Sequence, residues 1–235
     1  MKYSFFGTCA NDYDQFYKCL ETMVSQKLMP TQIVLINSGD KDIKNEILKI
    51  INRQSIELLY FKIKIPRVNA LNLAIENIKT KYSFRFDTRT RFSKDYAEKA
   101  LNILKDKLID ARVVGGVPEI ISPSNNFQSV LCSSIMKRAY LFFYPSHRKI
   151  GFDGYSASVY LGCFETYLIK KIKYRETQTL ISEDSLIIKD FMDLGYKTYI
   201  SSSIKVSYVS RDSFFNLLKL FNTYGYCRAN TIFSS

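Results

Sequence analysis

The segment SFRFDTRTRF, residues 83–92, alternates apolar or small side chains with charged ones, as expected of a β-strand with two different faces. One face carries three phenylalanines, and the other carries Arg85, Asp87, Arg89 and Arg91. Two interpretations of this single carboxylate among guanidinium groups are open. Surface ion pairs would contribute only about 0 to 1 kcal/mol each. Alternatively, the cations form a site for a ligand that is more negative than the protein.

Short apolar runs alternate with helical patterns from the N-terminus up to this segment. Strands are predicted at 3–8, 32–37, 56–61 and 82–87, and helices between them at 13–26, 43–51 and 71–78. This alternation predicts an α/β fold with a mostly parallel sheet that is covered by helices on both faces. Ligands of such sheets bind outside the carboxyl ends of the strands.

Asp87 should lie at that edge, because it is the last residue of the fourth predicted strand. The other three strands bring further polar groups to the same edge: Thr8 and Asn11, Asn37 and Asp40, and Arg67. The sequence therefore predicts one crevice lined by polar and cationic side chains from separate strands.

The pattern is less regular after residue 93. Further strands are expected at 111–117, 158–164, 197–200 and 205–209, and helices at about 94–107, 182–195 and 213–224. The helix over 182–195 is the best marked, with Ser182 as its N-cap candidate and Gly195 at its end. Residues 118–155 give no clear pattern and read as loops.

The composition is that of one substantial globular domain, with 46% hydrophobic and 24% charged residues among 235. Its formal charge is +12, because 34 Lys and Arg outnumber 22 Asp and Glu. Nucleic acid, an anionic membrane or a phosphorylated substrate would suit this charge, which alone does not choose among them. No run of about 18 apolar residues is present to cross a bilayer, and the apolar run at the start is too short for a signal peptide.

Cysteine and histidine usage narrows the chemistry. Five dispersed cysteines without a CxxC pair indicate a reducing compartment rather than a disulfide framework or a zinc site. The single histidine, His147, excludes most nucleophile–histidine mechanisms and is expected at the surface.

Glu183 and Asp184 lie in the first turn of the helix predicted over 182–195. Acidic residues in this position commonly do no more than complement the helix dipole. The same dipole also stabilises an ionised carboxylate, which then remains a proton acceptor at neutral pH. The pair is therefore either a helix-stabilising feature or a candidate general base.

Six segments follow one another along essentially the whole chain: TCANDYDQFYKCLETMVSQKLMPTQIVLINSGDKD, PRVNALNLAIENIKTKYSFRFDTRTRF, VVGGV, VYLGCF, SEDSLIIKDFMDLGYKTYIS and FNTYGYCRAN. Their order and spacing resemble those of inverting family-2 glycosyltransferases with a GT-A fold. Within that family they are most similar to the branch of succinoglycan-type transferases of bacterial polysaccharide synthesis.

The resemblance implies one GT-A domain over 1–235, with a Rossmann-like central sheet flanked by helices and a C-terminal amphipathic helix. Residues 1–117 would bind the nucleotide-sugar, 118–212 the acceptor, and 213–235 would form the last helix and tail. The implied activity is sugar transfer with inversion from a nucleoside-diphosphate-sugar, with a UDP-sugar as the first choice. The acceptor would be a hydroxyl of a saccharide or of a polyprenyl-diphosphate-linked saccharide, in capsule, O-antigen or exopolysaccharide synthesis.

Matching positions carry the family's roles over to this chain. Asp184 corresponds to the catalytic base of the Glu-Asp element, with Glu183 as its neighbour and alternative. The positions that correspond to nucleotide-sugar-binding residues are Thr8, Asn11, Asn37, Asp40, Arg67, Asp87, Arg89 and Arg228. Asn37 stands where the family usually has the acid that binds the uracil ring, and Asp40 could substitute for it. In the unassigned segment, Glu119 and Asp153 are candidates for acceptor binding.

The metal motif departs from the family's pattern. Asp87 matches the first acid of the Asp-x-Asp element, but Arg89 replaces the second acid. We expect a Mg²⁺ or Mn²⁺ ion that is weakly held by Asp87 together with the donor diphosphate. Alternatively, Arg89 itself neutralises part of the charge on the leaving group.

The last predicted helix has two open interpretations. It either folds onto the domain or lies at a membrane interface, where the positive charge of the chain would favour the anionic inner face of the plasma membrane. The protein would then be cytoplasmic and peripheral.

Two rival functions also stay open. One is a homologue that binds nucleotide-sugar without transferring it, and the other is a basic nucleic-acid-binding protein. No recognition motif supports the second rival, and no nucleic acid partner is expected.

Overall fold

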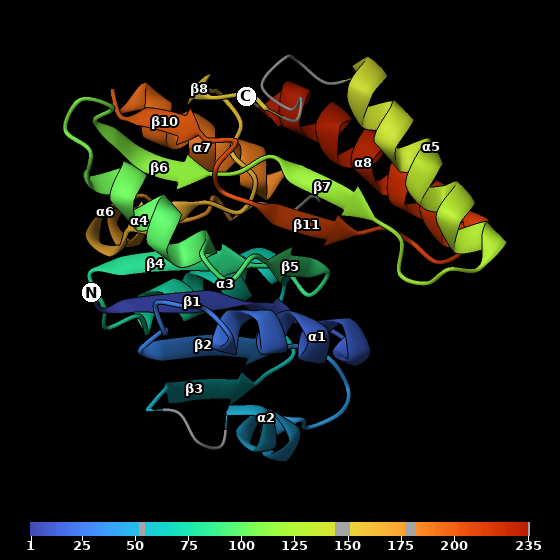
Figure 1. Ribbon diagram of the computed structural model, residues 1–235, viewed down its shortest axis with the longest axis horizontal. Helices are drawn as coiled ribbons and strands as arrows, with labels where there is room; N and C mark the ends of the chain where they lie inside the picture. Colours follow the sequence, from blue (N-terminus) through green and yellow to red (C-terminus); the bar gives the residue numbers. More distant parts are fainter. Residues whose placement is uncertain (52–54, 144–150, 177–181, 235) are drawn as a thin grey trace.

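The computed structural model describes residues 1–51, 55–143, 151–176 and 182–234, with the backbone alone at 140–143, 228 and 231–234 (Figure 1). Its strands are β1 (Tyr3–Cys9), β2 (Gln32–Asn37), β3 (Glu57–Lys62), β4 (Tyr82–Phe86), β5 (Thr90–Phe92), β6 (Ala111–Gly115), β7 (Pro118–Ile121), β8 (Gly154–Tyr155), β9 (Cys163–Glu165), β10 (Lys197–Ile200) and β11 (Val206–Val209). Its helices are α1 (Tyr13–Val24), α2 (Lys44–Ile51), α3 (Arg67–Glu76), α4 (Tyr96–Lys105), α5 (Phe127–Phe143), α6 (Thr166–Ile172), α7 (Glu183–Asp193) and α8 (Phe214–Ser234).

The described strands form two sheets. The large one has eight strands in the order β3-β2-β1-β4-β9-β6-β10-β8, and the small one has three in the order β5-β11-β7. Strands β1 to β4 are parallel, as the alternation of strands and helices predicts. β9 runs antiparallel between β4 and β6 and joins the two halves of the large sheet.

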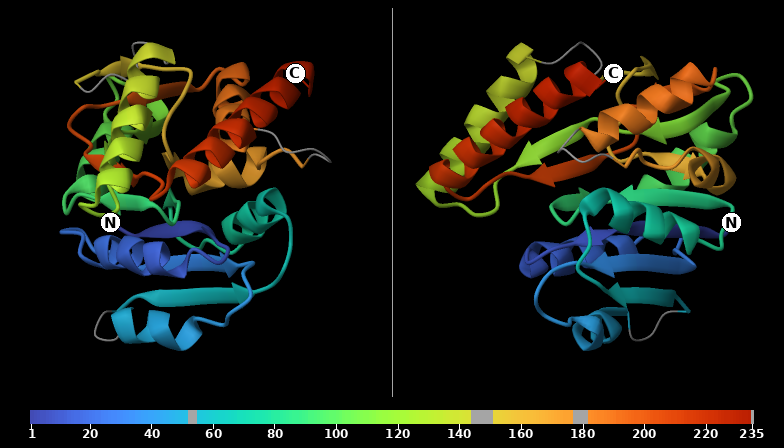
Figure 2. Two further views of the ribbon diagram at one scale, coloured as in Figure 1. Left: turned by 90° about the vertical axis from the view of Figure 1, so that its right-hand side faces the viewer. Right: turned by 180° about the vertical axis from the view of Figure 1, so that it is seen from behind.

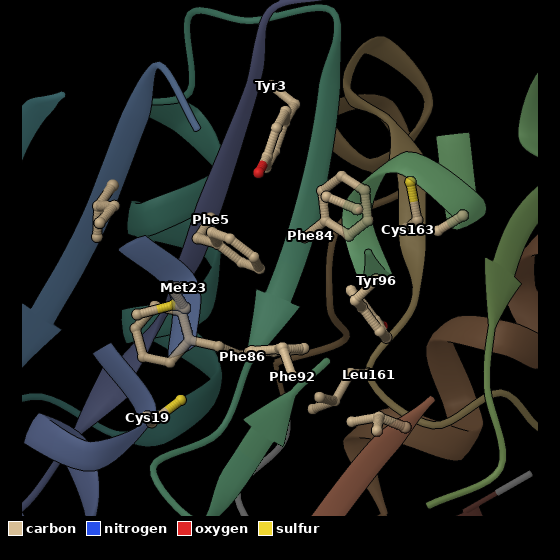
Figure 3. Close-up of a cluster of buried hydrophobic side chains, with 14 of the residues drawn as sticks. Tyr3, Phe5, Cys19, Met23, Phe84, Phe86, Phe92, Tyr96, Leu161 and Cys163 are labelled. Carbon is tan, nitrogen blue, oxygen red and sulfur yellow. The ribbon is translucent and has the colours of Figure 1, made fainter. Parts of the chain in front are cut away.

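Helices cover both faces of the large sheet, so the α/β architecture with a central sheet between helices is confirmed (Figure 1). On one face the core forms beneath α1, α2 and α4 and is rich in aromatic rings. Phe92 lies there with its ring centroid 4.7 Å from that of Tyr96 and 5.1 Å from that of Phe5 (Figure 3). On the other face, α3, α6 and α7 bury a second, mainly aliphatic core.

Residues 83–92 follow the predicted alternation of buried and charged side chains only within β4 and β5. Phe84, Phe86 and Phe92 are buried in the aromatic core. The strand ends at Phe86, and a turn over residues 87–89 precedes β5. The charged residues therefore do not share one face. Arg91 is separate from the other charged residues of the segment, and it donates hydrogen bonds to the main-chain and side-chain oxygens of Gln15.

The small sheet carries α5 and α8, which run side by side beyond one end of the large sheet (Figure 2). A third core holds them together with the sheet, and its buried members are Ile120, Cys132, Met136, Tyr208, Leu217 and Leu220. No helix in the described ranges is both long enough and apolar enough to span a bilayer.

Three of the structural expectations for residues 118–195 can be compared with the observed helices and strands. The helix over 182–195 is confirmed as α7, which ends before Gly195 at φ 82°. The strand expected at 158–164 is wrong in most of its length, because Leu161 and Gly162 have φ of 62° and 89° and only β9 remains. The region read as loops contains β7 and the 17-residue α5, while His147 lies outside the described residues.

Candidate active site

A pocket of about 580 Å³ lies at the carboxyl ends of β1 and β4, where α1, α3 and α7 also begin. Such a volume suits a ligand of moderate size. α8 borders it from another side, and the lining residues from that helix are Leu220, Thr223, Tyr224 and Cys227. Several residues singled out in the sequence meet here: Thr8, Arg67, Asp87, Arg89, Glu183 and Asp184. Asp87 and Asp184, 97 positions apart in the chain, thus share one pocket.

Arg85 is the buried centre of the charges in this pocket. Its side chain is 3% exposed and lies on the side of β4 that faces away from the aromatic core, 5.5 Å from the ring centroid of Tyr174. It donates a hydrogen bond of 2.9 Å to Glu183 and a longer one of 3.5 Å to Asp87. A buried guanidinium group needs such partners, because desolvation of an unpaired charge is costly.

Arg67 completes a network of four charged residues. It is the first residue of α3, after Pro66 at the N-cap position, and its guanidinium group reaches across the strand tips. Its Nη2 donates to Asp87 at 2.8 Å and its Nε to Glu183 at 2.9 Å. Two arginines therefore hold two carboxylates in fixed positions, one directly after β4 and one in α7.

The network keeps both carboxylates ionised. Burial raises the pKa of the Asp87 carboxyl, but the charges of Arg67 and Arg85 outweigh it and hold that pKa below its ordinary value. Burial also raises the pKa of Glu183, and again Arg85 and Arg67 lower it further than burial raises it. A carboxylate that two guanidinium groups stabilise in this way is a weak proton acceptor.

These shifts predict how stability depends on pH. Because the pKa of Glu183 is lower in the folded chain than in the unfolded one, its stabilising contribution is complete above about pH 5 and is lost as pH falls. We expect Glu183→Gln to lose less stability than the wild type between about pH 5 and pH 3, in thermal melts at each pH. Glu76→Gln, which removes an exposed ion pair with Lys173, serves as the control. Parallel pH profiles for the wild type and Glu183→Gln would contradict the assignment.

Arg89 belongs to a separate ion pair. Its Nε donates to Asp12 at 2.9 Å and its Nη1 donates to the carbonyl oxygen of Ser210 at 2.8 Å. Asp12 is the residue before α1, and its carboxylate faces the pocket rather than capping that helix. Arg89, which stands in place of the second motif acid, is thus paired with the carboxylate of Asp12, a residue that the sequence pattern did not mark as a site residue.

Two charged residues of the pocket remain without an ion pair among the described residues. The carboxylate of Asp184 is exposed and accepts a hydrogen bond from the main-chain N–H of Ser185 at 2.9 Å. Arg211, which follows β11, lines the pocket, and no described side chain pairs with its guanidinium group. Of the eight charged residues in the described lining, these two have no ion pair, so their charges are the most readily available to a ligand.

The predicted base-binding residues lie at the neighbouring strand tips, outside the described lining of the pocket. Asn11, at φ 58°, donates to Asp40 at 3.0 Å and accepts from its main-chain N–H at 2.8 Å. Asn37 is fully buried, and it donates to the carbonyl of Lys41 at 2.7 Å and to the hydroxyl of Tyr60 at 2.8 Å. Asn37 therefore uses one amide hydrogen to order the 37–41 turn and the other to bind Tyr60 of β3.

Of three further candidates, two lie outside the described lining of the pocket, and the side chain of the third is not described. Glu119 is exposed on β7. Asp153 accepts hydrogen bonds from the Ser201 hydroxyl at 2.6 Å and the Ser202 main chain at 3.1 Å, which fixes the turn after β10. Arg228 lies on α8 next to Cys227, and its side chain is outside the part of the structure that is described.

The residues present fit the expected Mg²⁺ or Mn²⁺ ion poorly. Nowhere in the described ranges do three or more His, Cys, Asp or Glu side chains converge as a metal site. Asp87 is already neutralised by two guanidinium groups, and Arg89 occupies the position of the second acid. Hard divalent cations need several oxygen ligands, so a protein-held ion would have to displace these arginines.

The fold defined by these sheets and helices is the GT-A fold of glycosyltransferases. Solved structures with this arrangement align with 94% of the chain, although their sequence identity is low. No family model matches the sequence, and no curated protein matches it either.

Two of these structures are particularly informative. The first is TarS 1–349 of S. aureus in complex with UDP, with a TM-score of 0.65 and 14% identity. The second is the mannosyltransferase PcManGT of Pyrobaculum calidifontis in complex with GDP-Man and Mn²⁺, with a TM-score of 0.66 and 12% identity. The chain spans 64% of the TarS chain and 60% of the mannosyltransferase chain.

Proposed function

We propose that the chain is an inverting glycosyltransferase that moves a sugar from a nucleoside-diphosphate-sugar, in the first place a UDP-sugar, to a hydroxyl of a saccharide or lipid-linked saccharide. The observation that carries the proposal is one pocket at the carboxyl edge of the sheet that holds both Asp184, without an ion pair, and a set of arginines. The nucleotide-sugars named with the TarS and mannosyltransferase structures support it. The products would enter bacterial surface polysaccharide, such as capsule, O-antigen or exopolysaccharide.

The donor would occupy the 1–117 half of a single domain. Its diphosphate would lie near Arg67, Asp87 and Arg89, while the Asn11, Asn37 and Asp40 turns would border the base. The acceptor would enter from the 118–212 half. Glu119 and Asp153 lie outside the described pocket lining, so they would meet only distant parts of a long acceptor.

The chemistry then follows from the two residues without an ion pair. Asp184 accepts the proton of the acceptor hydroxyl as that oxygen attacks the anomeric carbon. A new carbon–oxygen bond forms, the bond to the diphosphate oxygen breaks on the opposite side, and the nucleoside diphosphate leaves with the electron pair. Arg211 and the half-exposed Arg67 stabilise the negative charge that develops on it. Glu183 positions these groups rather than acting as base, because its lone pairs already serve two arginines.

Nucleotide titrations test the proposal. UDP and GDP should raise the melting temperature in EDTA almost as much as in Mn²⁺, because guanidinium groups rather than a protein-held metal meet the diphosphate. Arg211→Gln should weaken this binding roughly tenfold, the value of one charge-assisted hydrogen bond. Arg112→Gln, which removes a surface cation paired with Asp110, is the control and should bind as the wild type does.

Failure to bind any nucleoside diphosphate, with or without Mn²⁺, would refute the proposed function. Binding that requires Mn²⁺ would instead support the metal at Asp87 and refute the role given to the arginines. Nucleotide-sugar binding without hydrolysis or transfer, across a panel of donors and acceptors, would identify a homologue that has lost catalysis.

A further inference from the structure

The first turns of α5 and α8 lie together at one end of the molecule. The hydroxyl of Ser129 donates to the carbonyl of Asp212, just before α8, at 3.2 Å. From this end, beyond the tips of β7 and β11, the helices run side by side in the same direction, back along the small sheet (Figures 1 and 2). We call this end the helical tip and define it by six apolar residues: Phe127, Val130, Leu131, Phe214, Phe215 and Leu218.

The helical tip exposes apolar surface that the fold does not use. The side chain of Phe127 is 84% exposed and that of Phe215 is 76% exposed. The other four members are each more than two-fifths exposed. They do not belong to the core of this region, whose buried residues on these two helices are Cys132, Met136, Leu217 and Leu220. Single exposed apolar residues are common, but a cluster of six marks an interaction surface.

The two helices of the helical tip carry charges of one sign. Residues 122–151 and 213–235, which contain both helices, include no Asp or Glu, whereas the chain as a whole has 22. Exposed cations follow the apolar residues along the same helices: Lys137 and Arg138 on α5, and Lys219 on α8. The acid nearest in sequence, Asp212, accepts a hydrogen bond from Asn216 at 3.1 Å. An exposed apolar cluster on helices whose charged side chains are all cations is complementary to an anionic lipid surface.

α8 connects this surface to the candidate active site. Phe215 and Leu218 face outward, while Leu220, Thr223, Tyr224 and Cys227 line the pocket from later turns of the same helix. Fewer than ten residues of α8 separate the two surfaces. Because a helix rises 1.5 Å per residue, the surfaces lie roughly 15 Å or less apart along the helix axis. A lipid surface at the helical tip would therefore lie close to the pocket.

We propose that the helical tip inserts into the headgroup region of an anionic lipid bilayer. The lipid contact stands independently of catalysis. Its consequence for the acceptor rests on the proposed function, since a pocket held beside a bilayer suits an acceptor anchored in that bilayer by a lipid diphosphate.

Vesicle sedimentation tests the contact with the whole chain. The wild type should co-sediment with phosphatidylcholine vesicles that contain phosphatidylglycerol, and less with pure phosphatidylcholine vesicles, and added salt should weaken the binding. The double variant Phe127→Ser/Phe215→Ser should bind at least about tenfold more weakly, because two exposed rings no longer enter the interface. Lys219→Glu should lose roughly tenfold on the anionic vesicles alone.

Controls separate this proposal from its alternatives. Leu108→Ser removes another highly exposed apolar side chain, between α4 and β6, and should bind vesicles as the wild type does. Melting temperature and UDP binding of the double variant should stay at wild-type values. Absence of vesicle binding by the wild type, or equal loss in Leu108→Ser, would overturn the proposal. So would self-association that the double variant abolishes, since the helical tip would then join two copies of the chain.

Discussion

Asp184→Asn should reduce sugar transfer by roughly 10²- to 10⁴-fold, the usual contribution of a positioned general base. The amide has nearly the shape of the carboxylate and can still accept the hydrogen bond from the Ser185 main chain. Because it cannot take up a proton, the acceptor hydroxyl stays a weak nucleophile. Nucleotide affinity should stay within about twofold of the wild type, since Asp184 holds no cation in place and has no role in donor binding. The measurements are release of nucleoside diphosphate at saturating substrates and a separate nucleotide titration.

Two comparison variants decide between the adjacent carboxylates. Asp193→Asn lies at the other end of α7 and should transfer sugar at the wild-type rate. Glu183→Gln should lose stability and some activity, but less activity than Asp184→Asn. Full turnover by Asp184→Asn would remove the base assignment. A reversed order of the two losses would transfer that role to Glu183.

Arg85→Met should lower the free energy of unfolding by about 3 to 5 kcal/mol, the usual cost of removing one member of a buried ion pair. The methionine replaces the volume but leaves Glu183 with Arg67 as its remaining charged partner. It also removes the cation above the Tyr174 ring. Chemical denaturation at neutral pH measures the loss. The difference between variant and wild type should shrink as pH falls, because protonation of the Glu183 carboxylate removes the charge that Arg85 pairs with.

The matched control is Arg112→Met, whose guanidinium group is 37% exposed and pairs with Asp110 and Glu165. It should cost no more than about 1 kcal/mol. If Arg85→Met lowers the free energy of unfolding by as little as Arg112→Met does, the charged network does not hold α7 against β4. A double variant with Glu183→Gln extends the test, because that second change should cost less once Arg85 is absent.

The fold could be predicted where local signals agree with each other. The alternation of residues 82–86 and the glycine after 182–194 mark β4 and α7, because a strand needs one apolar face and a helix end needs a residue that tolerates positive φ. α5 was missed because its buried positions include Ser129 and Ser133 while Phe127 is exposed, so its apolar residues do not follow the buried face. The tertiary structure, not the periodicity, makes this segment a helix.

The site could be predicted as far as chain topology determines it. Parallel strands end at one edge, so Thr8, Arg67 and Asp87 had to approach one another. Which arginine pairs with which acid depends on the turn at 87–89 and on α7, which joins from the distant half of the chain. Asp12 gave a usable signal, as a helix-capping residue type directly after a strand tip. No sequence pattern distinguishes Arg211 from the other arginines.

The spacing of the four α8 residues that border the pocket sets a limit on how this chain can vary. Leu220 and Cys227 each lie three and four positions from the pair Thr223 and Tyr224, so the four residues form one stripe along the helix. One added or deleted residue after position 219 would rotate everything beyond it by about 100°. The stripe would then face away from the pocket, and side chains that are now exposed to solvent, such as Tyr226, would face it instead. Homologues of this chain should therefore vary α8 by exchange of side chains and not by changes of length within 220–227.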